Sequence, residues 1–207
     1  MNTRLVWNFE INNEKLLKLT SQQESYEELH WEARFFWPGD AIISLNGFDE
    51  RFLVLSNYNL KHRDDYYYLL PNADYNIKQR RQQLFYKPIL EKAKCLNGYG
   101  KKINLSESSP ELILSGSKTL TVAELAKDLQ ESPQAIEVKK EAFVYKFSTD
   151  PLIKLELARL EINKTIYFSL CIEGHSQKLV ASIAAQLLPA ETCSDYVSFL
   201  KQIQRSC

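Results

Sequence analysis

Residues 30–39, with the sequence HWEARFFWPG, alternate between charged and apolar side chains over their first six positions and end in Pro-Gly. In a β-strand, successive side chains point to opposite faces of the sheet. His30, Glu32 and Arg34 therefore share one face, and the opposite face carries only apolar side chains. This stretch predicts a strand with one charged and one apolar face.

Similar strand patterns recur along the chain, in segments that are rich in aromatic and β-branched residues or alternate in polarity. They cover residues 28–37, 63–70, 75–86, 142–147, 152–162 and 165–173. Helical periodicity is found at residues 122–130, at residues 177–188 and after Ser194. Because the connections between strands are mostly short, an antiparallel sheet is favoured over a parallel one. We predict an α+β fold, an antiparallel β-barrel or tunnel with a polar interior and helices packed on the outside.

The composition favours a single domain without a strong overall electrostatic field. A chain of 207 residues with 44% hydrophobic content can bury one sizeable core. We expect residues 27–207 to form this domain and residues 1–26 to be an N-terminal extension packed on it. Lysine and arginine number 26, as do aspartate and glutamate, so any anion-binding site must be local. We therefore expect no binding to nucleic acid or membranes.

The cysteines and the N-terminus suggest an intracellular protein. Four cysteines are dispersed without paired spacing, namely Cys95, Cys171, Cys193 and Cys207. This pattern disfavours both a zinc knuckle and a secreted disulfide framework, so we expect free thiols. No apolar run is long enough for a signal peptide core or a membrane span, and we expect a cytoplasmic location.

The polar strand faces carry both signs of charge. Carboxylates lie on some strands, whereas others carry a basic series, namely Lys78, Arg80, Lys87, Lys140 and Lys154. If these faces line a common lumen, they form a site for a polyanion and its cation. The alternative is an ordinary sandwich whose charged faces meet water.

In their order along the chain, these segments resemble the CYTH (triphosphate tunnel) proteins. Residues 31–39 resemble the first-strand ExExK motif of that family, and residues 169–174 resemble its terminal ExE-G strand. The intervening matches are an aspartate-tyrosine strand, a basic strand, a lysine strand and a K-x-R strand, at residues 63–68, 76–81, 86–88 and 138–145. Residues 195–200 are similar to the family's closing serine-tyrosine helix. The resemblance spans about residues 28 to 202.

The resemblance implies an antiparallel tunnel that acts on phosphorylated compounds. Activities in the family include hydrolysis of inorganic triphosphate, thiamine triphosphate or RNA 5′-triphosphate, and adenylate cyclisation. Carboxylates hold Mg or Mn ions there, and basic residues hold the phosphates. Hard divalent cations prefer oxygen ligands, and Arg and Lys neutralise the oxygens of a transferring phosphoryl group.

The chain departs from the family pattern mainly at acidic positions. His30 replaces the first Glu of ExExK, and Arg34 replaces its Lys. Ala158 stands at an aspartate position, Cys171 at the first Glu of the terminal motif, and Ala142 at the K-x-R arginine. The chain therefore lacks more of the family's cation-binding residues than of its anion-binding residues.

The resemblance assigns roles to the residues that remain. Glu32 and Glu173 are the catalytic and metal-binding candidates, with His30 as a further ligand and Mg or Mn as the ion. A softer ion such as Mn or Zn, held by His30 and Cys171, is an alternative. The substrate-binding candidates are Arg34, Lys78, Arg80, Lys87, Lys140 and Lys154.

Three functions remain open at this stage. The first is binding, with or without hydrolysis, of a triphosphate-containing or other phosphorylated anion by a monomer or homodimer. The second is a catalytically inactive CYTH-like binding or scaffolding module. The third is an unrelated α+β protein with a protein partner. Base stacking by Tyr66-Tyr67-Tyr68 near Arg80 and Arg81 is disfavoured by the zero net charge.

Overall fold

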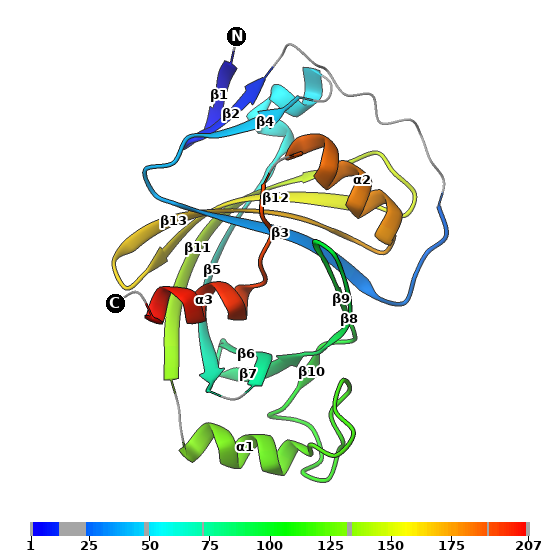
Figure 1. Cartoon of the computed structure of the whole chain (residues 1–207), viewed down its shortest axis with the longest axis vertical. Coiled ribbons are helices and arrows are strands. Elements are labelled where there is room, and N and C mark those ends of the chain that lie inside the picture. Colours follow the sequence, from blue (N-terminus) through cyan, green and yellow to red (C-terminus); the bar gives the residue numbers. More distant parts are fainter. Residues whose placement is uncertain are drawn as a thin grey trace.

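The computed structural model describes residues 2–12, 24–47, 50–71, 73–131, 134–189 and 191–205. Its main element is a ten-stranded antiparallel sheet that curls into a half-barrel (Figure 1). The strands are, in spatial order, β10 (Ile103–Asn104), β7 (Gln83–Lys87), β6 (Ala73–Arg80), β5 (Asn59–Leu70), β11 (Gln134–Lys146), β12 (Ile153–Ile162), β13 (Thr165–Gly174), β3 (His30–Pro38), β9 (Leu96–Tyr99) and β8 (Ile89–Ala93). The predicted α+β class is confirmed.

A second, three-stranded sheet contains the first strands of the chain. It consists of β1 (Asn2–Val6), β2 (Phe9–Asn12) and β4 (Ile43–Asn46), with β2 and β4 parallel. Two short 3₁₀ helices follow, at Glu50–Leu53 and Leu55–Asn57. The sequence patterns predicted none of the three strands of this small sheet.

Hairpin turns explain where the strand predictions succeeded and where they failed. Residues 75–86 form two strands instead of one, because Arg81 and Gln82 turn the chain with φ values of 49° and 65°. Asn163 and Lys164 make a similar turn between β12 and β13, with φ values of 51° and 66°. Positive φ at both central residues usually calls for Asn, Asp or Gly, so a turn at Arg-Gln has no compositional signal.

Apolar side chains cover the outer, convex face of the half-barrel. Helix α2 (Gln177–Leu187) buries Val180 and Ile183 in one cluster with Phe35 of β3 and Leu170 of β13. The small sheet joins the same cluster through Phe9 and other fully buried residues. Helix α1 (Val122–Glu131) packs in a separate cluster against the outer side of β6 and β7. Strand β2 of the small sheet thus shares its buried residues Phe9 and Ile11 with the core on the outer face of the main sheet.

Helix α3 (Tyr196–Arg205) does not lie outside as predicted but packs on the concave face. Its residues Tyr196 and Leu200 share a buried cluster with Tyr67 of β5, Val138 of β11 and Leu160 of β12. The register places these strand residues on the same face as the charged side chains. One part of the barrel interior is therefore apolar, and the predicted polar interior is restricted to the remainder.

A disulfide joins Cys95, between β8 and β9, to Cys193, before α3. The expectation of free thiols is wrong for this pair, which is 98 residues apart in sequence and 5.4 Å apart between Cα atoms. Cys171 is a free, buried thiol, and Cys207 lies outside the described residues. Since disulfides are rare in cytosolic proteins, the cytoplasmic expectation loses the support of the cysteine pattern. Within the described ranges, no helix is long and apolar enough to span a membrane.

The disulfide closes a long loop and thereby restricts the unfolded chain. Its removal should therefore destabilise the protein. We expect Cys95→Ala to lower the free energy of unfolding by about 2–4 kcal/mol. Urea denaturation of the oxidised proteins measures the effect. Equal stability of variant and wild type, or no Cys95–Cys193 peptide in a non-reducing digest, would contradict the pairing.

Candidate functional site

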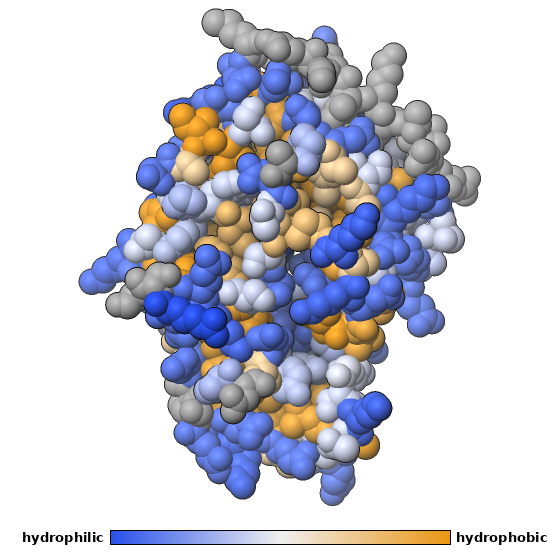
Figure 2. Space-filling model, in the orientation of Figure 1, coloured by the Kyte–Doolittle hydropathy of each residue, from blue (hydrophilic) through white to orange (hydrophobic). Residues whose placement is uncertain are grey.

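The strand register brings the charged faces of β3, β12 and β13 together on the concave side of the sheet. Glu32 lies directly opposite Glu173, and Glu173 in turn lies opposite Lys154. Cys171 of β13 lies opposite Arg34 of β3 on one side and opposite Glu156 of β12 on the other. The charged strand faces predicted from alternation thus line one concavity. Figure 2 shows hydrophilic side chains along a hollow between α3 and the β8–β9 hairpin.

Glu156 and Glu32 are the centres of one group of ion pairs. The Oε1 atom of Glu156 lies 3.3 Å from Nη1 of Arg34 and 2.9 Å from Nζ of Lys140. Arg34 also lies 3.6 Å from Glu32, which accepts a hydrogen bond from Lys87. Glu156 was not among the site residues predicted from the sequence. The alternation of polar and apolar residues along β12 did, however, place it on the polar face of that strand.

Asp65 is the centre of a second group of ion pairs. Its carboxylate contacts Nζ of Lys78 at 3.3 Å and accepts two hydrogen bonds from the guanidinium of Arg80. Asp65 is 4% exposed, so this pairing offsets the cost of its burial. Lys78 also lies over the ring of Tyr67, which stacks on Tyr196 of α3. This stack connects the ion pairs to the apolar part of the interior.

Burial and ion pairing have opposing effects on the pKa values of these groups. Burial opposes ionisation of Glu32, but the charges of Lys87 and Arg34 lower its pKa to about 2. For Glu156 burial acts in the same way, and Lys140 and Arg34 again hold the pKa well below its ordinary value. Burial lowers the pKa of Lys78 to about 7, against the favourable effect of Asp65. Lys78 is thus the one of these groups that changes charge near neutral pH.

His30, Glu32 and Glu173 form a group that can hold a cation, with ligand atoms within 4.8 Å of one another. The Nε2 atom of His30 is 3.4 Å from Oε2 of Glu173. Two carboxylates directly opposite each other on adjacent strands repel, and a cation between them relieves that repulsion. One imidazole nitrogen and two carboxylate oxygens suit Mn²⁺ or Zn²⁺ better than Mg²⁺, which prefers oxygen ligands.

Among the described residues, the cation-binding group consists of His30, Glu32 and Glu173, and Cys171 is not part of it. It is fully buried, and burial raises the pKa of its thiol well above the ordinary value. Metals bind the thiolate form of cysteine, so this environment disfavours Cys171 as a ligand. The structure therefore separates the two residues proposed for a softer ion and keeps only His30 near the carboxylates.

The remaining predicted residues lie at the edges of the site. Lys154 is one-third exposed and 4.0 Å from Glu173. The three tyrosines of β5 do not share a face: Tyr66 is exposed and bonds to Glu137, whereas Tyr67 is buried inside. Stacking of bases on all three is thus excluded by the alternation of the strand.

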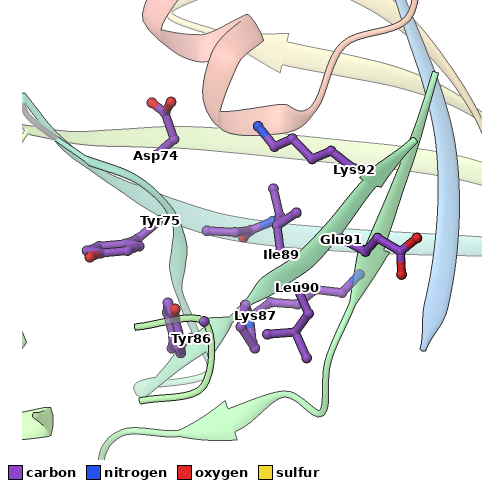
Figure 3. Close-up of a pocket in the computed structure, with 11 residues that line it drawn as sticks. Asp74, Tyr75, Tyr86, Lys87, Ile89, Leu90, Glu91 and Lys92 are labelled. Carbon is purple, nitrogen blue, oxygen red and sulfur yellow. The ribbon is translucent and has the colours of Figure 1, made fainter. Parts of the chain in front are cut away.

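A cavity of about 230 Å³ borders the site at Lys87. In Figure 3, Asp74 and Lys92 lie on one side of this cavity, and Tyr86 and Lys87 lie on the other. Asn76 also lines it, and its buried Oδ1 atom has no hydrogen-bond partner among the described residues. A buried acceptor of this kind requires a donor from water or from a ligand.

Comparison with known proteins adds little to this geometry. Neither a scan of protein-family models nor a search of curated proteins gives a match. Among solved structures, a crystal structure of a "putative adenylate cyclase" from Bacillus halodurans is 13% identical to this chain. The match covers 72% of this chain and 83% of the other, with a TM-score of 0.36. We base the site on the residues of this chain alone.

The lowered pKa of Glu32 predicts acid sensitivity. Because the folded-state value of about 2 lies below the ordinary 4.5, the ionised Glu32 stabilises the fold above pH 4.5. This contribution, about 3 kcal/mol, is lost as the pH falls from about 5 to 2. Urea denaturation in EDTA should show a smaller loss over this range for Glu32→Gln than for wild type. The exposed Glu131→Gln is the control and should behave as wild type; an equal acid loss in all three proteins would refute the assignment.

Proposed function

We propose that the charged part of the half-barrel binds a triphosphate-containing or other phosphorylated anion, together with a divalent metal held by His30, Glu32 and Glu173. The observation that carries the proposal is an excess of basic side chains on a concave, partly buried face. This proposal agrees with the function expected from the resemblance to CYTH proteins.

The excess is visible in the ion pairs themselves. On this face, the three carboxylates of Glu32, Glu156 and Asp65 are paired with five basic side chains, so the acids do not neutralise the bases; the five are Arg34, Lys78, Arg80, Lys87 and Lys140. The register adds Lys61 and Arg63 of β5 beside Ala142 and Lys140 of β11. A phosphorylated anion brings several oxygens that accept charge-assisted hydrogen bonds from such groups. Binding would let the bases exchange part of their contacts with protein carboxylates for contacts with phosphate.

The site also has the components for metal-assisted hydrolysis. A divalent ion at His30, Glu32 and Glu173 would polarise a phosphoryl oxygen and lower the pKa of a bound water. The protein's own residues would hold the anion through Arg34 and Lys87, which both contact Glu32. They would thereby place the phosphates next to the carboxylates.

A second candidate function is anion binding without turnover. The observation that favours it is the engagement of the carboxylates with basic side chains. Asp65 and Glu156 are paired in this way outside the cation group, and Glu32 within the group is itself paired with Arg34 and Lys87. The two functions differ in one measurable outcome, the metal-dependent release of phosphate.

Binding is tested with tripolyphosphate and isothermal titration calorimetry. Lys87→Met removes a basic group of the concave face and should weaken binding about 10-fold to 100-fold, since a hydrogen bond to a charged group contributes about 1.5–3 kcal/mol. The matched control is Lys127→Met, whose side chain is 73% exposed on α1. No binding by wild type, or equal loss in both variants, would contradict the proposal.

Phosphate release from tripolyphosphate in the presence of Mn²⁺ or Mg²⁺ separates the two candidate functions. Release that is lost in Glu173→Ala supports the hydrolase. Binding without release in wild type supports the inactive module.

The affinity for tripolyphosphate should fall as the pH rises from about 6 to 8. Lys78 has a pKa of about 7, and the groups around it are Asp65, Arg80, Lys140 and Lys87. A bound anion favours the protonated lysine, so binding takes up a proton and weakens when Lys78 is neutral. Lys78→Arg stays charged and should show a smaller decrease than wild type across this range, measured by calorimetry with the same ligand. An identical pH dependence in both proteins would show that Lys78 is not involved.

A further inference from the structure

His175, which follows β13, is held by the backbone of Glu27. Its Nδ1 atom is 3.0 Å from the carbonyl oxygen of Glu27, and the Glu27 amide donates to the carbonyl of His175 at 2.8 Å. A carbonyl oxygen only accepts hydrogen bonds, so Nδ1 of His175 must carry the hydrogen. Tyr26 stacks on the ring with centroids 4.4 Å apart. The orientation and the tautomer of His175 are thus both determined.

This tautomer determines that of His30. With hydrogen on Nδ1, the Nε2 atom of a neutral His175 is an acceptor, and it lies 3.4 Å from Nδ1 of His30. His30 must therefore donate from Nδ1. Its Nε2 atom is left with a free lone pair, which faces Oε2 of Glu173 at 3.4 Å. Two acceptors then face each other, and this contact is favourable only with a cation or a proton between them.

A metal ion meets this requirement better than a proton. Glu32 lies directly opposite Glu173, so the lone pair of His30 faces a pair of carboxylates. A histidine ligand is commonly oriented by a hydrogen bond from its other nitrogen, which is the arrangement that His175 provides. Zn²⁺, Co²⁺ and Mn²⁺ accept an imidazole nitrogen, whereas Mg²⁺ prefers oxygen.

We propose that His175 is a positioning residue that holds His30 with its Nε2 lone pair directed at Glu173, and that it thereby makes the site selective for imidazole-accepting ions such as Zn²⁺ over Mg²⁺. The proposal rests on the metal site of the proposed function. It adds a residue outside the predicted set and narrows the class of ion.

The tautomer is measured directly by NMR of the metal-free protein labelled with ¹⁵N-histidine, at pH 8. The chain has three histidines, so their assignment by single substitution is simple. We expect His30 to be protonated at Nδ1 in wild type and in His175→Gln, whose side-chain oxygen can accept the same hydrogen bond. In His175→Phe, which keeps a ring for Tyr26, we expect His30 to shift toward Nε2 protonation. Nε2 protonation of His30 in wild type would overturn the proposal.

The effect on the ion is measured by competition with a chelator. Loss of a hydrogen-bond partner of a ligand typically weakens metal binding about 10-fold to 100-fold. We expect this loss for Zn²⁺ in His175→Phe, a smaller loss in His175→Gln, and no change for the exposed control His62→Phe. Tight Zn²⁺ binding that is unchanged in His175→Phe would overturn the role of His175 but keep the metal site. Nδ1 protonation of His30 without binding of any divalent ion would refute the metal site, and with it the ion selectivity, while the hydrogen-bond chain would stand.

Discussion

The pairing of buried charges on the concave face is the constraint on which the rest of the structure depends. An unpaired carboxylate in a partly buried site costs several kcal/mol, so Asp65 and Glu156 are tolerable only beside their basic partners. The strands that carry these partners, β3, β5, β6, β11 and β12, must therefore keep one register. A shift by one residue would turn the charged side chains into the apolar outer layer.

Helix α3 divides the barrel interior into an apolar and a charged part. Its apolar stripe needs a partner, and the inner face of β5, β11 and β12 offers one where their side chains become small or aliphatic, as at Ala142 and Ala158. The Cys95–Cys193 disulfide attaches the segment before α3 to the β8–β9 hairpin.

Most of the main sheet was predictable because the alternation of polarity can be recognised within the sequence of a single strand, as in His30 to Phe35. The parity of each strand also predicted that Glu32 and Arg34 share the polar face of one strand and that Glu173 lies on the polar face of another. That these faces line one lumen was a hypothesis at that stage. The predictions failed where the determining contact is not local. Examples are the N-terminal strands and the role of Glu156, whose partners come from β3 and β11. The turn at Arg81 and Gln82 is local, but these residue types carry no turn signal.

The sequence by itself determined which residues alternate, where the helices begin, and that acids and bases share the polar faces of the strands. These features depend on side chains that are close together along the chain. Only the tertiary structure decided that α3 enters the barrel, that Cys95 meets Cys193, and that His175 contacts His30 at 3.4 Å. Each of these depends on contacts between residues far apart in sequence, and local patterns carry no information on which of many such contacts the folded chain will make.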